Sequence, residues 1–212
     1  MLGLPKKTEL KKQLPKNAIY AKFNMNTAAK DKFDADIKRI LIVNEVSEVT
    51  TAIKKGEKVS SFFVLLVLLK RDTFDEKNIG LISKLINQNM LFILQYEGKS
   101  KLAIYHTKLM QTDWQNNDNL SIQLKGLNLD TVWENIIIQV GEIHIEQGNT
   151  LDEQIGIDAK YKVLQKKIES LEKQARSEKQ PKRKFELVQE ISNLKHRIES
   201  VSKKCQGGIG ND

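Results

Sequence analysis

The sequence predicts an α+β protein, in which a mixed β-sheet with packed helices is followed by a C-terminal antiparallel helical hairpin of the coiled-coil type. Three observations support this fold class. The run Ser61–Leu69 is apolar at every position after the serine, which is typical of a central strand buried on both faces. Strand-like and helix-like segments alternate around this run. The last third of the chain repeats apolar residues at heptad spacing, with an interruption at Pro181.

Residues 1–26 are expected to form a basic and mostly irregular N-terminal arm. Pro5 and Pro15 interrupt any long helix in this segment. Lysines outnumber acids here, since residues 1–30 contain seven lysines and one acid. Tyr20 and Phe23 lie among these lysines, and we expect them to attach the arm to the core. The alternative is that they belong to a nucleic-acid-binding surface.

The globular α+β domain is expected to span residues 27–141. Asn26 or Thr27 can cap its first helix, because their side chains accept hydrogen bonds from free backbone N–H groups. Two β-branched runs follow, Ile40–Val43 and Val46–Ile53, and both favour strands. The alternation in the second run does not fix its register.

A helix, a β-hairpin and a second helix are expected after the buried strand. Thr73–Glu76 matches a capping box. The helix it predicts has an apolar face made of Ile79, Ile82, Leu85 and Ile86. Met90–Tyr96 and Lys101–Thr107 are predicted to be paired strands, because a turn sequence with a glycine separates them. Asn128 or Asp130 caps a further helix.

Residues 150–204 are predicted to form the coiled-coil hairpin, which opens with a capping box at Thr150–Glu153. The first apolar stripe consists of Ile157, Tyr161, Leu164, Ile168, Leu171 and Ala175. The second stripe consists of Leu187, Ile191, Leu194, Ile198 and Val201. Because the second stripe is out of phase with the first, we expect two helices with a bend at Gln180–Pro181. Residues 205–212 are expected to be a disordered tail.

The composition favours a cytoplasmic protein with no membrane span. The net charge is +8 with a pI near 9.4, and Cys205 is the single cysteine. One cysteine cannot form an internal disulfide, which fits a reducing compartment. The most apolar run, Phe62–Leu69, is much shorter than the ~20 residues that cross a bilayer.

The sequence gives little support for catalysis, and we expect no catalytic residue, metal ligand or cofactor. The three histidines have no metal-ligand spacing, and the glycines form no phosphate-binding loop. One enzymatic alternative is a divalent-metal-dependent nuclease that uses Lys70 with Glu45 or Glu48. Leu66 and Leu68 stand where such a site would need carboxylates. The sequence therefore does not decide whether the protein is an enzyme, and it favours a protein that is not one.

Two kinds of binding residue are predicted. The hairpin residues expected to bind a protein partner are Leu164, Ile168, Leu171, Phe185, Val188 and Leu194. The residues expected to contact nucleic acid are Lys6, Lys7, Lys11, Lys12, Lys179, Lys182, Arg183 and Lys184. A two-helix seam can leave flanking side chains such as Val163 free for the partner.

Several segments resemble a bacterial and archaeal family known only as a domain of unknown function. They are Met1–Glu9, Leu91–Lys99, Thr112–Trp114, Leu124–Asp130, Glu178–Gln180 and Arg183–Lys184. The resemblance implies that family members are commonly encoded beside superfamily-two helicases and DNA adenine methyltransferases in restriction-like defence loci. It implies no catalytic residues. Relatives often carry acids before the lysine of the buried strand, where this chain has leucines.

These observations predict a non-enzymatic accessory or adaptor subunit of a bacterial DNA-defence system. Its hairpin would bind the helicase or methyltransferase of the same locus, or a second copy of the chain. The first alternative is a nucleic-acid-binding protein, with DNA as a candidate ligand, that uses the basic arm and the hairpin tip. The second alternative is the metal-dependent nuclease.

Overall fold

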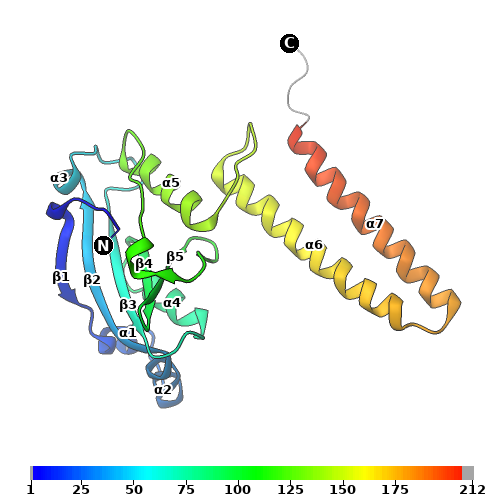
Figure 1. The fold of residues 1–212 in the computed structure, drawn as a ribbon, viewed down its shortest axis with the longest axis horizontal. Helices are drawn as coiled ribbons and strands as arrows, with labels where there is room; N and C mark the ends of the chain where they lie inside the picture. The colour runs from blue at the N-terminus through cyan, green and yellow to red at the C-terminus, as the bar shows by residue number, and fades with distance from the viewer. Residues whose placement is uncertain (1, 207–212) are drawn as a thin grey trace, which may run out of the picture. The chain divides into compact units, whose positions relative to one another are not determined.

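The computed structural model describes residues 2–206, with side chains described for residues 2–198. The chain divides into two compact units that part between Glu142 and Ile143. The first unit contains the β-sheet and the second contains the two long helices (Figure 1). Each unit has its own cluster of buried apolar residues.

Seven strands of the described chain form one sheet in the first unit. In spatial order they are β1 (Glu9–Gln13), β2 (Ile37–Ser47), β3 (Ser61–Leu69), β4 (Asn89–Tyr96), β5 (Lys99–Tyr105) and β6 (Leu109–Gln111), with β7 (Gln115–Asn116) also paired to β5. Strands β3 and β4 are parallel, and the other pairs are antiparallel. The predicted mixed sheet is therefore confirmed, with β3 in a central position.

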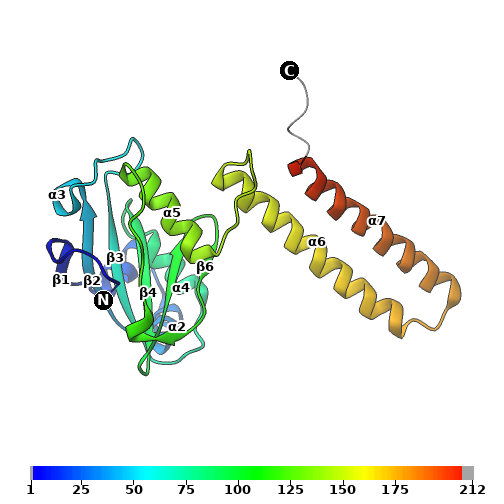
Figure 2. The same cartoon turned by 45° about the horizontal axis from the view of Figure 1, so that its top comes forward.

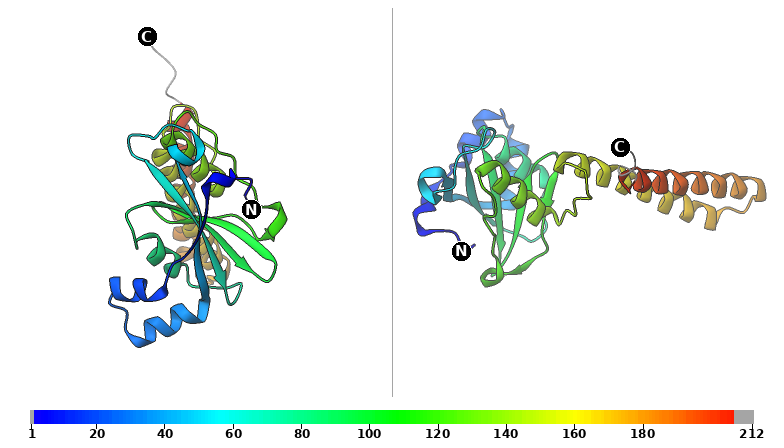
Figure 3. Two further views of the ribbon diagram at one scale, coloured as in Figure 1. Left: turned by 90° about the vertical axis from the view of Figure 1, so that its left-hand side faces the viewer. Right: turned by 90° about the horizontal axis from the view of Figure 1, so that it is seen from above.

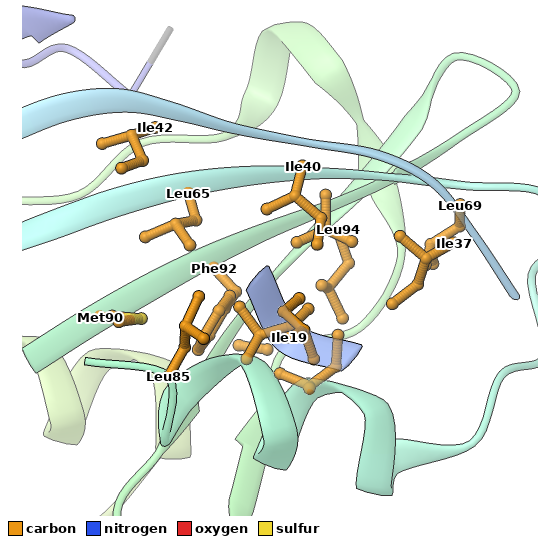
Figure 4. Packing of buried hydrophobic residues seen from close by; sticks show 14 of the residues in the cluster. Ile19, Ile37, Ile40, Ile42, Leu65, Leu69, Leu85, Met90, Phe92 and Leu94 are labelled. Atoms are coloured by element: carbon orange, nitrogen blue, oxygen red, sulfur yellow. The ribbon is translucent and has the colours of Figure 1, made fainter. Parts of the chain in front are cut away.

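Helices cover both faces of this sheet because the central strands are apolar on both sides. The helices of this unit are η1 (Lys6–Thr8), α1 (Lys16–Lys22), α2 (Thr27–Asp36), α3 (Glu48–Thr51), α4 (Glu76–Ser83), η2 (Asn117–Asn119) and α5 (Leu129–Gly141). Leu65 and Val67 of β3 point into a cluster shared with Ile19 of α1 and Ile79 of α4 (Figure 4). On the other face α5 crosses the sheet (Figure 2), and its Trp133 ring lies 5.0 Å from the Phe62 ring, centre to centre.

The expected irregular arm over residues 1–26 is wrong. This segment contains η1, the edge strand β1 and helix α1, and β1 pairs with β2 through backbone hydrogen bonds. The expected attachment of Tyr20 and Phe23 to the core is confirmed, since both pack against the buried cluster. Tyr20 lies edge-on to the Phe33 ring, with 5.8 Å between ring centres.

Two further expectations about local structure are wrong. The strand expected over Val46–Ile53 ends at Ser47, because the Thr50 hydroxyl accepts a hydrogen bond from the Ser47 N–H at 2.9 Å and this contact opens α3. Helix α4 is capped by Asp75 instead of Thr73, so it begins two residues later than the predicted capping box implies. Ile86, expected in the buried face of this helix, lies beyond its end and is 39% exposed.

The second unit confirms the predicted helical hairpin. Helices α6 (Leu151–Ser177) and α7 (Pro181–Gln206) pack side by side in antiparallel directions (Figure 3). The predicted capping box forms, since the Glu153 carboxylate accepts a hydrogen bond from the Thr150 N–H at 2.8 Å. Of the expected disordered tail, residues 207–212 and the Cys205 side chain lie outside what the structure describes. Within the described chain, no helix combines the length and the apolar character needed to cross a membrane.

Candidate interaction surfaces

The seam between α6 and α7 uses most of the apolar stripe residues. Its buried members are Ile168, Leu171, Ala175, Ile191 and Leu194, with Leu164, Leu187 and Ile198 partly buried beside them. The 3–4 spacing places them on one side of each helix, as in a coiled coil. Four residues expected to bind a partner belong to this seam, namely Leu164, Ile168, Leu171 and Leu194. Their side chains pack between the two helices and stabilise the hairpin.

The remaining predicted partner residues, Phe185 and Val188, are exposed on α7. Their exposed fractions are 64% and 51%. They are three residues apart, so they share one face of the helix. Val188 is seven residues from Lys195, which pairs with Glu172 at 2.9 Å on that flank of the hairpin. Phe185 and Val188 therefore form one small apolar patch near the bend, which we call the tip patch.

Val163 of α6 is also exposed, but it lies elsewhere. Its exposed fraction is 68%. It precedes Lys167 by one helical turn, and Lys167 pairs with Glu190 at 2.8 Å on the other flank of the hairpin. Val163 lies near the middle of α6, 14 residues before the helix ends at Ser177. Val163 is thus separate from the tip patch.

The tip patch adjoins a strongly basic segment. Residues 173–184 contain one acid, Glu178, and six bases, which are Lys173, Arg176, Lys179, Lys182, Arg183 and Lys184. All six bases are exposed. The Glu178 carboxylate is held within the bend, where a hydrogen bond from the Gln180 N–H at 2.9 Å lowers its pKa. The hairpin tip therefore presents a positive field around an apolar centre.

The N-terminal lysines expected to contact nucleic acid are in a different setting. Lys6 and Lys7 are on η1, and Lys11 and Lys12 are on the edge strand β1. All four are exposed. Lysines on an edge strand also prevent pairing with another chain, which gives them a structural role. They belong to the first unit, whereas the hairpin tip belongs to the second.

The residues of the nuclease alternative do not meet. In the β2–β3 ladder Glu45 pairs with Phe63, near the start of β3, whereas Lys70 follows the end of that strand. Seven residues of extended chain separate the two levels, or roughly 23 Å. Glu48 lies beyond the same distant end, in α3. The expected site of Lys70 with Glu45 or Glu48 is therefore wrong. Within the described residues, no group of three or more His, Cys, Asp or Glu side chains is arranged to hold a metal.

Two aspartates, Asp34 and Asp36, lie near Lys70, and one of them is buried. Asp36 is 1% exposed, and its carboxylate accepts hydrogen bonds from Arg71 Nε at 2.6 Å and Asn78 Nδ2 at 2.7 Å. Asp34 is about half exposed and accepts from Lys16 Nζ at 2.5 Å. Burial alone would raise the Asp34 pKa, but the hydrogen bonds from Lys16 and Tyr20 lower it. These contacts tie α1, α2 and the loop after β3 together.

A buried lysine forms a second unusual cluster in the first unit. The Lys101 side chain is 8% exposed, and its ammonium lies 4.7 Å from the Trp114 ring centre and 5.0 Å from that of Phe74. Cation–π attraction holds the charge in this position. Burial lowers the Lys101 pKa, although the negative charges of Glu76 and Asp113 oppose the shift.

A polar groove of about 600 Å³ lies at the starts of β3 and β4. It is lined by Lys22, Lys58, Ser60, Ser61, Ser83, Lys84, Ile86, Asn87, Gln88, Asn89, Met90, Tyr105 and His106. None of these described lining residues is an acid. No sequence pattern predicts this groove, because its lysines come from three distant segments that only the folded topology brings together.

The family of the chain follows from a match along nearly all of its length. The model of a domain of unknown function, DUF4391, matches residues 2–198. The chain belongs to the DUF4391 family. Because the match extends into α7, the DUF4391 domain includes both the sheet and the hairpin. No curated protein and no solved structure matches the chain.

Proposed function

We propose that the chain is a non-enzymatic adaptor subunit of a bacterial DNA-defence system and that its hairpin tip binds a protein partner. The tip patch is the observation that supports this. The hairpin has an apolar seam of its own, and Phe185 and Val188 still remain exposed outside it. An exposed aromatic and a β-branched residue on one helix face form the kind of anchor that inserts into a partner's apolar groove.

The charges around the tip patch indicate the chemistry of the partner. Six basic residues and one acid precede Phe185 in residues 173–184, and two acids, Glu186 and Glu190, follow it. The segment keeps a net positive charge, so the complementary surface is acidic at its rim and apolar at its centre. A second copy of the chain does not fit this description, because two tips of the same positive charge repel each other. A nucleic acid offers phosphates to the lysines and arginines and a stacking face to Phe185, but Val188 has no ring that could stack on a base. A protein groove with an acidic rim fits both features.

The resemblance stated above supplies the candidate partners, which are the helicase and the methyltransferase encoded in the same locus. The test co-expresses the tagged chain with each of them and measures co-purification. The Phe185→Ser/Val188→Ser variant removes the tip patch without touching the seam. Val163→Ser is the matched control, because it removes an equally exposed apolar side chain from the other flank.

We expect the wild-type chain and the control to co-purify with the partner. The amount of partner that co-purifies with the tip-patch variant should be at least tenfold lower. Retention of the partner by the tip-patch variant would refute the proposal. A third variant, Lys182→Glu/Arg183→Glu/Lys184→Glu, distinguishes the nucleic-acid alternative from the adaptor proposal. If this variant abolishes a DNA mobility shift while the tip-patch variant leaves it intact, the tip is a nucleic-acid surface and the adaptor proposal is wrong.

A further inference from the structure

We propose that the groove at the starts of β3 and β4 binds a nucleoside phosphate, either free or as part of a single-stranded nucleic acid. This site is in the first unit and does not depend on the function proposed for the hairpin. Its evidence consists of the charge of the groove, the hydrogen-bonding groups in its walls, and the contacts that hold those walls in place.

The groove carries net positive charge. Lys22, Lys58 and Lys84 line it, and none of its described lining residues is an acid. The Asp130 carboxylate offsets part of the Lys58 charge. The remaining positive charge favours a ligand that brings several negative oxygens. Phosphate esters satisfy this requirement, since each phosphate offers charged acceptor oxygens to lysine.

The polar groups between the lysines extend the recognition beyond phosphate. Ser60, Ser61 and Ser83 provide hydroxyl groups, and the side chains of residues 87–89 provide three consecutive amides. An amide both donates and accepts, so it matches the mixed edges of a nucleobase and the hydroxyls of a sugar. A bare anion has only acceptors and would leave the amide oxygens unused. The volume of about 600 Å³ also lies within the range of about 300–1,000 Å³ typical of sites for small organic ligands.

Several contacts hold the walls in place before any ligand arrives. Lys22 Nζ donates to the Leu85 carbonyl oxygen at 2.6 Å and keeps further donors available for a ligand. The backbone N–H of Lys58 donates to the Asp130 carboxylate at 3.1 Å, which fixes the opposite wall. The Lys84 ammonium lies 5.5 Å from the centre of the Tyr105 ring. A preformed arrangement of this kind lowers the entropic cost of binding.

The negative end of α4 faces this region, but its carbonyl groups are already hydrogen-bonded. The Gly80 carbonyl accepts from Ser83 Oγ at 2.9 Å, and the Leu81 carbonyl accepts from the Lys84 N–H at 3.3 Å. Just beyond the helix, the Leu85 carbonyl accepts a hydrogen bond from Lys22 Nζ. The partial negative charge of the helix end is thereby covered by donors, and the lysine ammonium groups dominate the local field.

The test measures binding of ATP and of a fluorescein-labelled oligothymidylate of about ten nucleotides to the full chain, in about 50 mM and about 200 mM salt. The variant Lys58→Gln/Lys84→Gln removes two groove charges and leaves the Lys22–Leu85 contact in place. The variant Lys32→Gln/Lys125→Gln removes the same charge from exposed positions elsewhere in the first unit and serves as the control. Far-UV circular dichroism confirms that each variant is folded.

We expect the wild-type chain to bind at least one probe and the groove variant to bind it at least tenfold more weakly, with the control unchanged. For the oligonucleotide, loss of two phosphate contacts makes the negative slope of log K against log salt shallower by about 1.4. Binding of ATP alone identifies a free nucleotide as the ligand, and tighter binding of the oligonucleotide identifies a strand. The proposal is overturned if neither probe binds, if the control loses as much affinity as the groove variant, or if inorganic phosphate competes as well as ATP.

Discussion

The buried carboxylate of Asp36 accepts a hydrogen bond from Nε of Arg71 at 2.6 Å, and this pair fastens the end of α2 to the loop after β3. The same carboxylate accepts from the Asp75 N–H at 2.9 Å and from Asn78 at 2.7 Å. The Asp36 backbone oxygen also accepts from the Lys70 N–H at 2.8 Å. One side chain thus organises the entry into α4.

Replacement of this carboxylate is expected to destabilise the first unit strongly. In Asp36→Asn an amide group would face donors that need an acceptor, and the Arg71 charge would lose its partner. We expect the free energy of unfolding to fall by about 3 kcal/mol, measured by urea denaturation. Asp31→Asn, an exposed position on the same helix, should change it by less than about 0.5 kcal/mol. Equal stability of the two variants would contradict this role for Asp36.

The carboxylate of Asp130 predicts a pH dependence of stability. Burial alone would raise its pKa, but hydrogen bonds from the backbone N–H groups of Val59, Lys58 and Glu57 lower it. A pKa that is lower in the folded state contributes stability at neutral pH, which is lost as the pH falls from about 3.9 through the folded-state value. The urea midpoint of Asp130→Asn should therefore lie below that of the wild type at neutral pH and converge with it in acid. Asp118→Asn, at an exposed position, should show no such gap.

The seam of the hairpin should unfold independently of the sheet when it is weakened. Leu171→Ala leaves a cavity between α6 and α7, and we expect it to cost the hairpin about 2–3 kcal/mol. Both tryptophans of the chain, Trp114 and Trp133, lie in the first unit, so their fluorescence reports on the sheet alone. The variant should shift the unfolding transition seen by circular dichroism and leave the fluorescence transition unchanged. Val163→Ala, at an exposed position, should shift neither by more than about 0.5 kcal/mol.

Lys101 also predicts a stability that rises with pH, but in the alkaline range. Its pKa is lowered by burial, so the folded state binds fewer protons than the unfolded state in the pH range just below the usual lysine value of about 10.4. Stability therefore rises with pH in that range. The wild type should gain stability relative to Lys101→Met as the pH rises from neutral toward 10, in urea denaturation at a series of pH values. Lys99→Met, an exposed neighbour on the same strand, should show a constant difference, and the same constant difference for Lys101→Met would refute the argument.

The parts of the fold that the sequence predicts correctly have strong local signals. The composition of Ser61–Leu69, which is almost entirely apolar, predicts the buried strand β3. The two heptad-spaced apolar stripes, with Pro181 between them, predict the helical hairpin. The capping box at Thr150–Glu153 forms because both partners sit at the start of a helix that the hairpin seam stabilises. In each case the signal that predicts the element lies within the element's own residues.

The parts that were missed depend on distant neighbours. Strand β1 has one apolar side chain in five, and it forms because β2 offers free backbone groups at the sheet edge. The turn at Ser47 lies within a β-branched run, which favours a strand. The Ser47–Thr50 capping pair is the sequence signal that predicts α3 there. The groove lysines at 22, 58 and 84 share no sequence pattern, since they meet only after β3 and β4 have paired.

The most direct test of the hairpin proposal is site-specific photo-crosslinking in the native host. Benzoylphenylalanine is placed at position 188, in the tip patch, and in a second strain at position 163, on the other flank. We predict that position 188 crosslinks to the helicase or methyltransferase of the same locus and that position 163 does not. Equal crosslinking at both positions, or crosslinking of the tip only to nucleic acid or to a second copy of the chain, would contradict the proposed function.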